Sequence, residues 1–170
     1  MNGTAILTIS DTRAQGVRED TTTPRLRRVL EEAGWTVRDA AVVPDERAQI
    51  QERLIDFADR LHASLVVTTG GTGFGPRDVT PEATRAVIER EAPGLAEAMR
   101  ASTAGRNPLA WLSRATAGLR GRTLILNLPG HPQGAEECLR AVLPLLPHAL
   151  AMMEGQAHAH EHARSIPPHH

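Results

Sequence analysis

The most constraining part of the sequence is a glycine-rich run that directly follows an apolar segment. Residues 65–69 read LVVTT, a short β-branched run that is typical of a buried strand. Four glycines follow within GGTGFGPRD, and Thr80-Pro81 then has the pattern of an N-cap and a first helical residue. A strand, a glycine loop and a helix in this order can direct backbone N–H groups at an anion. The run therefore predicts an α/β fold with a phosphate-binding loop.

The loop differs from the two best-known phosphate-binding motifs. A Walker A loop needs Gly-Lys-Ser/Thr, but all 19 Lys and Arg residues of this chain are arginine. The run does not match the dinucleotide fingerprint either. Any cationic side chain that binds phosphate must therefore be an arginine, such as Arg77 or Arg114. The sequence also leaves open a tight strand–helix connection without a ligand, and arginines that only pair with Glu.

The rest of the sequence alternates between strand-like and helix-like segments. We expect strands at residues 4–10, 35–43, 65–69, 115–119 and 123–128. We expect helices at residues 24–34, 45–61 and 93–104 and a helix that starts at residue 81. A last helical region should follow Gly130 and carry apolar residues from Leu139 to Met153. Pro144 and Pro147 should break that last region. The alternation indicates a three-layer α/β/α domain with a mostly parallel sheet over residues 1–155.

Several polar residues follow the predicted strands and should lie at one edge of the sheet, because ligands bind at the carboxyl ends of parallel strands. They are Ser10 and Asp11, Asp45, the glycine loop to Asp78, and the turn from Asn127. Asp45 and Asp78 could together hold Mg²⁺ beside the phosphates of a nucleotide. The alternative is that Asp45 only caps the following helix and that Asp78 is only a turn residue.

Composition excludes several other classes of protein. A net charge of −1, two Trp and no Tyr argue against nucleic acid as a partner. No apolar run approaches the ~18 residues of a membrane span, and the first residues do not resemble a secretion signal. The single cysteine, Cys138, fits a reducing compartment, so we expect a cytoplasmic location and a core or boundary position for this thiol. Residues 156–170 form a histidine-rich tail that we expect to be disordered, although it could bind a divalent metal loosely.

The motifs are more specific together than separately. ISDT, VVPDE, TTGGTGFGPRDVTPEAT, PLAWLSR and LILNLPGHP resemble the molybdenum cofactor biosynthesis family, which includes MogA, MoaB and the G-domains of gephyrin. The resemblance covers about residues 4–155. The segment LSRATAGLRGRTLILNLPGHP is most similar to the MogA branch, the molybdopterin adenylyltransferases. One motif departs from the family, because Asp20 is followed by three threonines where Lys-Ser-Gly is common.

The resemblance implies an enzyme that uses MgATP to adenylylate molybdopterin, with release of pyrophosphate. It implies Asp45 and Asp78 as catalytic and Mg²⁺-binding residues. It implies that substrate and nucleotide are bound by Ser10, Asp11, Thr22, Gly70, Gly71, Thr72, Gly73, Ser113, Asn127, Pro129 and Gly130. It further implies a homotrimer, and it leaves open a partner enzyme that inserts molybdate. The alternatives are a MoaB-like protein that binds pterin with little or no catalysis, and a scaffold subunit.

Overall fold

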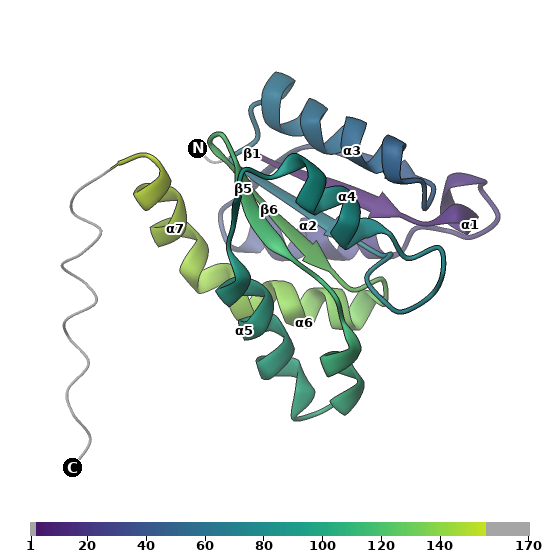
Figure 1. Ribbon diagram of the computed structural model, residues 1–170. Helices are drawn as coiled ribbons and strands as arrows, with labels where there is room; N and C mark the ends of the chain where they lie inside the picture. The colour runs from purple at the N-terminus through teal and green to yellow at the C-terminus, as the bar shows by residue number, and fades with distance from the viewer. Residues whose placement is uncertain (1–2, 156–170) are drawn as a thin grey trace, which may run out of the picture.

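The structure is a computed structural model that describes residues 3–155, and one sheet runs through this part of the chain (Figure 1). The strand order is β2-β1-β3-β6-β5-β4. Strands β2, β1, β3 and β6 are parallel to one another, whereas β5 is antiparallel to both of its neighbours. This confirms the predicted, mostly parallel sheet. The strand bounds are β1 Gly3–Ile9, β2 Thr36–Val43, β3 Leu65–Thr69, β4 Arg90–Glu91, β5 Ala117–Arg120 and β6 Thr123–Leu128.

Helices cover both faces of the sheet and bury two separate hydrophobic clusters. In β1, for example, Ile6 belongs to one cluster and Leu7 to the other, as the alternation of side chains along a strand requires. The first cluster lies under α2 Thr22–Glu32, α5 Pro93–Ala104, α6 Pro132–Val142 and α7 Leu146–Met153. The second lies under α3 Arg47–Ile55 and α4 Thr80–Val87 (Figure 1). The three-layer α/β/α architecture is therefore confirmed.

The helix boundaries differ from the predictions in a few places. The helix expected from residue 45 begins at Arg47 and continues into a π-helical turn, η1 Asp56–Arg60. A four-residue helix, α1 Asp11–Ala14, follows β1 and was not among the predicted helices. The last helical region is broken as expected, since the 3₁₀ turn η3 Leu143–Leu145 separates α6 from α7. Within residues 3–155, the helices are too short or too polar to cross a membrane.

Strands β5 and β6 form a hairpin with a glycine in its turn and an asparagine side chain bonded at its open end. Arg120 pairs with Thr123 across a two-residue turn, and Gly121 at its first position has φ 52°. The predicted strand began at residue 115, but the observed strand begins at Ala117. The reason is that the side chain of Asn127, not a ladder carbonyl, accepts the N–H of Thr116 at 3.2 Å.

The two tryptophans lie in opposite environments. Trp35 is 6% exposed and packs in the first cluster. Trp111 is 59% exposed and lies on the 3₁₀ turn η2 Pro108–Leu112. No residue of η2 is buried, so this turn forms an exposed, largely apolar segment beside the core.

The histidine-rich segment 156–170 lies outside the described residues.

Candidate functional site

The carboxyl ends of β1, β3 and β6 meet at Gly70. Its N–H donates to the Leu128 carbonyl at 3.2 Å, and its own carbonyl accepts from Thr80 Oγ1 at 2.8 Å. Gly70 has φ 103°, and a Cβ placed there would lie 2.2 Å from the Ile9 carbonyl oxygen. A Cβ on Gly130 would come within 3.3 Å of the Gly70 Cα. The strand-end turns are therefore packed against one another, as expected from the parallel sheet.

The glycine loop presents backbone N–H groups that the protein itself does not use. Among the hydrogen bonds of residues 3–155, the N–H groups of Gly71, Thr72 and Gly73 donate to no protein acceptor. Gly75 N–H, in contrast, donates to Asp78 Oδ2 at 2.9 Å and ties this carboxylate to the loop. Gly71 has φ 67°, and a Cβ there would lie 2.3 Å from Thr80 Oγ1. Free amides on a glycine loop form a concavity suited to an anion.

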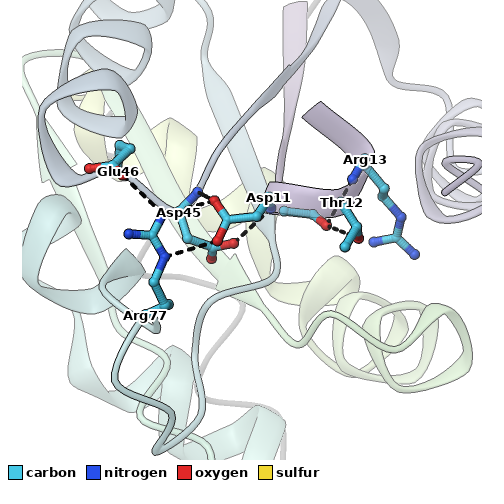
Figure 2. Close-up of polar contacts among 7 residues, drawn as sticks. Asp11, Thr12, Arg13, Asp45, Glu46 and Arg77 are labelled. Carbon is cyan, nitrogen blue, oxygen red and sulfur yellow. Dashed lines mark hydrogen bonds and ion pairs between the residues drawn. The ribbon is translucent and has the colours of Figure 1, made fainter. Parts of the chain in front are cut away.

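An acidic cluster, made of Asp11, Asp45, Glu46 and Arg77, lies on one side of this loop (Figure 2). Asp11 and Asp45 each accept the backbone N–H of the other, at 3.0 and 2.9 Å. Arg77 donates to both carboxylate oxygens of Asp11, each at 2.9 Å, and also to Glu46 Oε1 at 2.9 Å. One arginine thus joins the starts of α1 and α3 to the glycine loop.

The two aspartates of this cluster differ in their electrostatics. Hydrogen bonds from Arg77 lower the pKa of Asp11. The pKa of Asp45 is raised, first by burial of the carboxyl group and then by the negative charges of Asp11 and Asp78. Both Asp45 and Asp78 lie against the glycine loop, since a Cβ on Gly73 would be 2.9 Å from Asp78 Oδ2. A Cβ on Gly71 would be 3.1 Å from Asp45 Oδ1, so this oxygen faces the loop.

The prediction that Asp45 caps a helix is wrong. Helix α3 has Glu46 at its N-cap position, and no side chain caps it. Asp45 Oδ2 instead accepts the N–H of Asp11, whereas Oδ1 has no donor among the described residues. Thr80 is likewise not a cap but the first residue of α4, and its hydroxyl donates to the Gly70 carbonyl. The Oδ1 atom of Asp45 is therefore available to a ligand, whereas Oδ2 is held by Asp11.

A cavity of about 660 Å³ lies on the other side of the loop, between α5, η2 and α6. It brings together eight of the predicted site residues, namely Gly71, Thr72, Gly73, Asp78, Ser113, Asn127, Pro129 and Gly130. Much of the remaining wall is apolar and comes from residues such as Met99, Leu109 and Leu112. A cavity of this size can hold most of a drug-sized molecule.

Arg114, which follows η2 in the chain, holds the glycine loop through several hydrogen bonds. Its Nε donates to the Gly73 carbonyl and its Nη2 to the Asp78 carbonyl, both at 2.7 Å. Its Nη1 pairs with Glu82, and its backbone N–H donates to the Thr72 carbonyl at 2.9 Å. Arg77 and Arg114 are thus both paired with carboxylates, which was the simpler of the two interpretations of these arginines.

The other predicted site residues lie outside the cavity or are used internally. Ser10 caps α1 by accepting the Arg13 N–H at 3.3 Å. Asn127 lines the cavity but is fully buried, and its amide donates to Thr68 and Thr84 at 3.0 and 2.9 Å. Thr22 is fully buried, and its hydroxyl has no hydrogen-bond partner and no exposure to solvent. This geometry does not bring Thr22 to the site, because its side chain points into the protein.

Sequence reasoning missed several residues of the cavity wall. Arg100 and Thr103 come from α5, and Gln133, Glu137 and Cys138 come from α6. Burial raises the pKa of the Cys138 thiol, which agrees with the predicted core or boundary position. The helical spacing of these residues was visible in the sequence, but the cavity face became defined only when α5 and α6 packed together.

Comparison with known proteins agrees with this geometry. Residues 5–148 match the family model of a probable molybdopterin binding domain. A molybdopterin adenylyltransferase of Helicobacter pylori strain J99 is 41% identical over 152 residues, which cover 88% of this chain and 86% of that protein. The molybdenum cofactor synthesis protein cinnamon of Drosophila melanogaster is 43% identical over 149 residues. That match covers 87% of this chain but only 25% of the longer Drosophila protein.

A solved structure supports the same assignment. The molybdopterin biosynthesis enzyme MoaB of Thermus thermophilus superposes with a TM-score of 0.87 at 52% identity, over 92% of this chain and 98% of that one. The family resemblance inferred from the motifs is thereby confirmed. The chain belongs to the molybdopterin-binding domain family of molybdenum cofactor biosynthesis.

Proposed function

We propose that this protein transfers the adenylyl group of ATP to the terminal phosphate of molybdopterin. The observation that carries the proposal is the position of the glycine loop. Its unused N–H groups at Gly71–Gly73 line the cavity, and the same loop adjoins the carboxylates of Asp45 and Asp78. A nucleotide's phosphates and an apolar ring system could thus be held on one continuous surface. The name of the Helicobacter relative, a molybdopterin adenylyltransferase, supports the same reaction.

The residues present fit a Mg²⁺ ion. Within residues 3–155, no group of three or more His, Cys, Asp or Glu side chains could hold a metal alone. Mg²⁺ commonly uses only one or two carboxylates together with substrate phosphates, and Asp45 and Asp78 would provide these. The pKa of Asp45 is raised first by burial and then by the charges of Asp11 and Asp78, and a bound cation would stabilise its ionised form. When bound, the ion would neutralise charge on the leaving pyrophosphate.

The reaction is a displacement at phosphorus. A phosphate oxygen of molybdopterin attacks the α-phosphorus of ATP, a new P–O bond forms, and the bond to the β-phosphate breaks as pyrophosphate leaves. The N–H groups of Gly71, Thr72 and Gly73 would donate to the phosphoryl oxygens as their charge increases. Arg114 holds these amides in place, and the packed turns at Gly70 keep both substrates aligned.

The proposal is tested with Asp78→Asn. The amide oxygen can still accept the Gly75 N–H, so the loop should keep its shape while the negative charge is lost. We expect adenylylation to fall by about 10²-fold or more, with molybdopterin binding retained. Turnover is measured as pyrophosphate release, and binding is measured by titration. Asp39→Asn, at an exposed site on β2, is the matched control and should keep full activity.

A second candidate function is a MoaB-like protein that binds pterin with little catalysis. The 52% identity to the Thermus protein named MoaB favours it. Titration with ATP in the presence of Mg²⁺ separates the two candidates, because only the adenylyltransferase needs saturable nucleotide binding. Undiminished turnover in Asp78→Asn, or no ATP binding by the unmodified protein, would contradict the first candidate.

We also propose, from the family resemblance, that the protein acts in the cytoplasm as a homotrimer. A partner enzyme that inserts molybdate would then consume the adenylylated product. Sedimentation equilibrium tests the trimer directly, and a mass of one or two chains would contradict it.

A further inference from the structure

The cavity holds one carboxylate that the proposed adenylyl transfer does not use. Asp78 and Glu137 are the carboxylates that line it, and only Asp78 belongs to the glycine loop. Glu137 lies on α6, where α6 packs against α5 (Figure 1). Its side chain is 24% exposed, so it is largely withdrawn from solvent. A carboxylate in this position accepts hydrogen bonds but cannot donate them when ionised.

Glu137 keeps one oxygen available for a ligand. Both of its partners contact Oε1: Gln133 Nε2 donates at 3.1 Å, and Arg106 Nη1 lies 3.7 Å away. Within residues 3–155, Oε2 receives no hydrogen bond. Arg106 is 73% exposed at its side chain, and exposed ion pairs contribute little, so a ligand could displace it at small cost.

A positively charged side chain on α5, the helix that packs against α6, lies in the same cavity wall. Arg100 of α5 also lines the cavity, and its Nη1 donates to the carbonyls of Ser113 and Ala115 at 3.1 and 2.9 Å. These two bonds hold the guanidinium and leave Nε and Nη2 without an acceptor among residues 3–155. Glu137 directly precedes Cys138 on α6, and both residues line the same cavity as Arg100. Their neighbours Ala96, Met99 and Leu112 supply apolar surface for a flat ring.

This arrangement suits the pyrimidinone edge of a pterin. That edge presents the 2-amino group and N3–H as adjacent donors, followed by the 4-oxo acceptor. A carboxylate can accept both donors, and a guanidinium can donate to the oxo group. Adenine presents an amino donor beside a ring-nitrogen acceptor, whose lone pair would face the carboxylate unfavourably. The Glu137 region therefore favours the pterin over the base of ATP.

We propose that Glu137 is the residue that selects the 2-amino-4-oxo edge of the pterin, with Arg100 facing the oxo group. The inference rests on the proposed function, and it adds a specificity residue outside the family motifs. Glu137 acts in binding, so its loss should raise KM for molybdopterin while kcat changes little. The glycine loop and the aspartates would be untouched by its substitution.

The test compares two ring systems that differ at one group. We would measure how well 6-hydroxymethylpterin and 6-hydroxymethyllumazine, in which an oxo group replaces the 2-amino group, displace molybdopterin. We expect the unmodified protein to prefer the pterin at least about tenfold, because the lumazine oxygen would face Glu137. In Glu137→Gln, pterin affinity should fall by about 10–100-fold and the preference should disappear, because the amide can donate to that oxygen.

The matched control is Glu136→Gln, on the same helix. Glu136 pairs with Arg25, Arg28 and Arg140 and does not line the cavity, so this variant should keep the pterin preference. The ratio of the two affinities would not change through a loss of stability alone. A pterin preference retained in Glu137→Gln would overturn the inference, as would failure of either ring to displace molybdopterin from the unmodified protein.

Two further outcomes separate this inference from the proposed function. Guanine carries the same edge as pterin, so stronger displacement by GMP than by 6-hydroxymethylpterin would assign Glu137 to a nucleotide base and overturn the inference. If adenylylation persists in the unmodified protein and is lost in Asp78→Asn, while Glu137→Gln behaves as wild type, only the role of Glu137 is wrong. If the unmodified protein does not bind molybdopterin, both proposals are wrong.

Discussion

The two sides of the glycine loop are built on different principles. On the acidic side, Asp11 and Asp45 accept each other's backbone N–H groups, and Arg77 ties Asp11 and Glu46 together. On the cavity side, much of the wall is apolar, and several polar groups, among them Glu137 Oε2, lack a partner within the described part of the chain. Neighbouring carboxylates repel one another, so hydrogen bonds within the protein must hold them together. A flat ligand ring instead needs an open cavity and polar groups that have no partner in the protein. The glycine loop borders both regions, and the unused N–H groups of Gly71, Thr72 and Gly73 let it contribute to ligand binding.

The two arginines that contact this loop region also differ from each other. Arg77 is 55% exposed at its side chain, and its hydrogen bonds go to carboxylates. Arg114 is 31% exposed and donates to two loop carbonyls as well as to Glu82. We therefore infer that Arg77 mainly organises charge, whereas Arg114 mainly holds the shape of the loop.

The largest effect is expected from Gly70→Ala, which should disrupt both sides at once. The added Cβ would clash with the Ile9 carbonyl at 2.2 Å, at a φ of 103° that alanine rarely adopts. Strain and overpacking together should lower the free energy of unfolding by about 2–5 kcal/mol. Chemical denaturation measures this loss. Gly94→Ala is the control, because a Cβ there meets nothing within 4 Å and helix α5 should tolerate or favour it.

Replacing the two arginines separately would sharpen the comparison. Arg114→Met removes hydrogen bonds from the carbonyls of Gly73 and Asp78 and leaves Glu82 unpaired, so we expect a loss of about 1–3 kcal/mol. Arg77→Met breaks a largely exposed cluster and should cost at most about 1 kcal/mol. Denaturation midpoints of the two variants test this order. Equal losses would remove the distinction between a shape-holding and a charge-organising arginine.

The smallest expected effect is a pH-dependent difference in the free energy of unfolding between the wild type and Asp45→Asn. The folded-state pKa of Asp45 is raised above 3.8, so its ionisation disfavours the folded state. That destabilisation develops as the pH rises from 3.8 through the folded-state pKa, and it is complete at neutral pH. Asparagine does not titrate, so the variant should be more stable than wild type at neutral pH, with the advantage shrinking on acidification. Unfolding of both proteins across this range measures it, and an advantage that grows on acidification would contradict it.

The sequence predicted the parts of the fold that depend on local patterns. The strand Leu65–Thr69, the break near Pro144 and the gathering of strand-end turns were all predicted from residue spacing and confirmed. The glycine loop could be recognised because its backbone demands glycine at Gly70 and Gly71, which both have positive φ. Local patterns of this kind can be predicted because they depend on the types of neighbouring residues.

Long-range partners could not be predicted in the same way. Arg77 contacts Asp11, which is 66 residues away, and Arg114 contacts Gly73, which is 41 residues away. Asp45 precedes a helix, which favoured a cap, but the return of the chain beside Asp11 supplied a different partner. Glu137 and Arg100 carry no motif, because their shared cavity exists only after α5 and α6 have packed.

The two tryptophans lie in different environments, so their fluorescence emission should report two different events. Trp35 is shielded in the core, so its emission should be blue-shifted, inaccessible to iodide and sensitive to global unfolding. Trp111 is exposed on η2 between Leu109 and Leu112, residues that line the cavity, so its emission should respond when the cavity fills. The chain has no tyrosine to contribute a background. Ligand entry and denaturation could therefore be followed separately, without any attached dye.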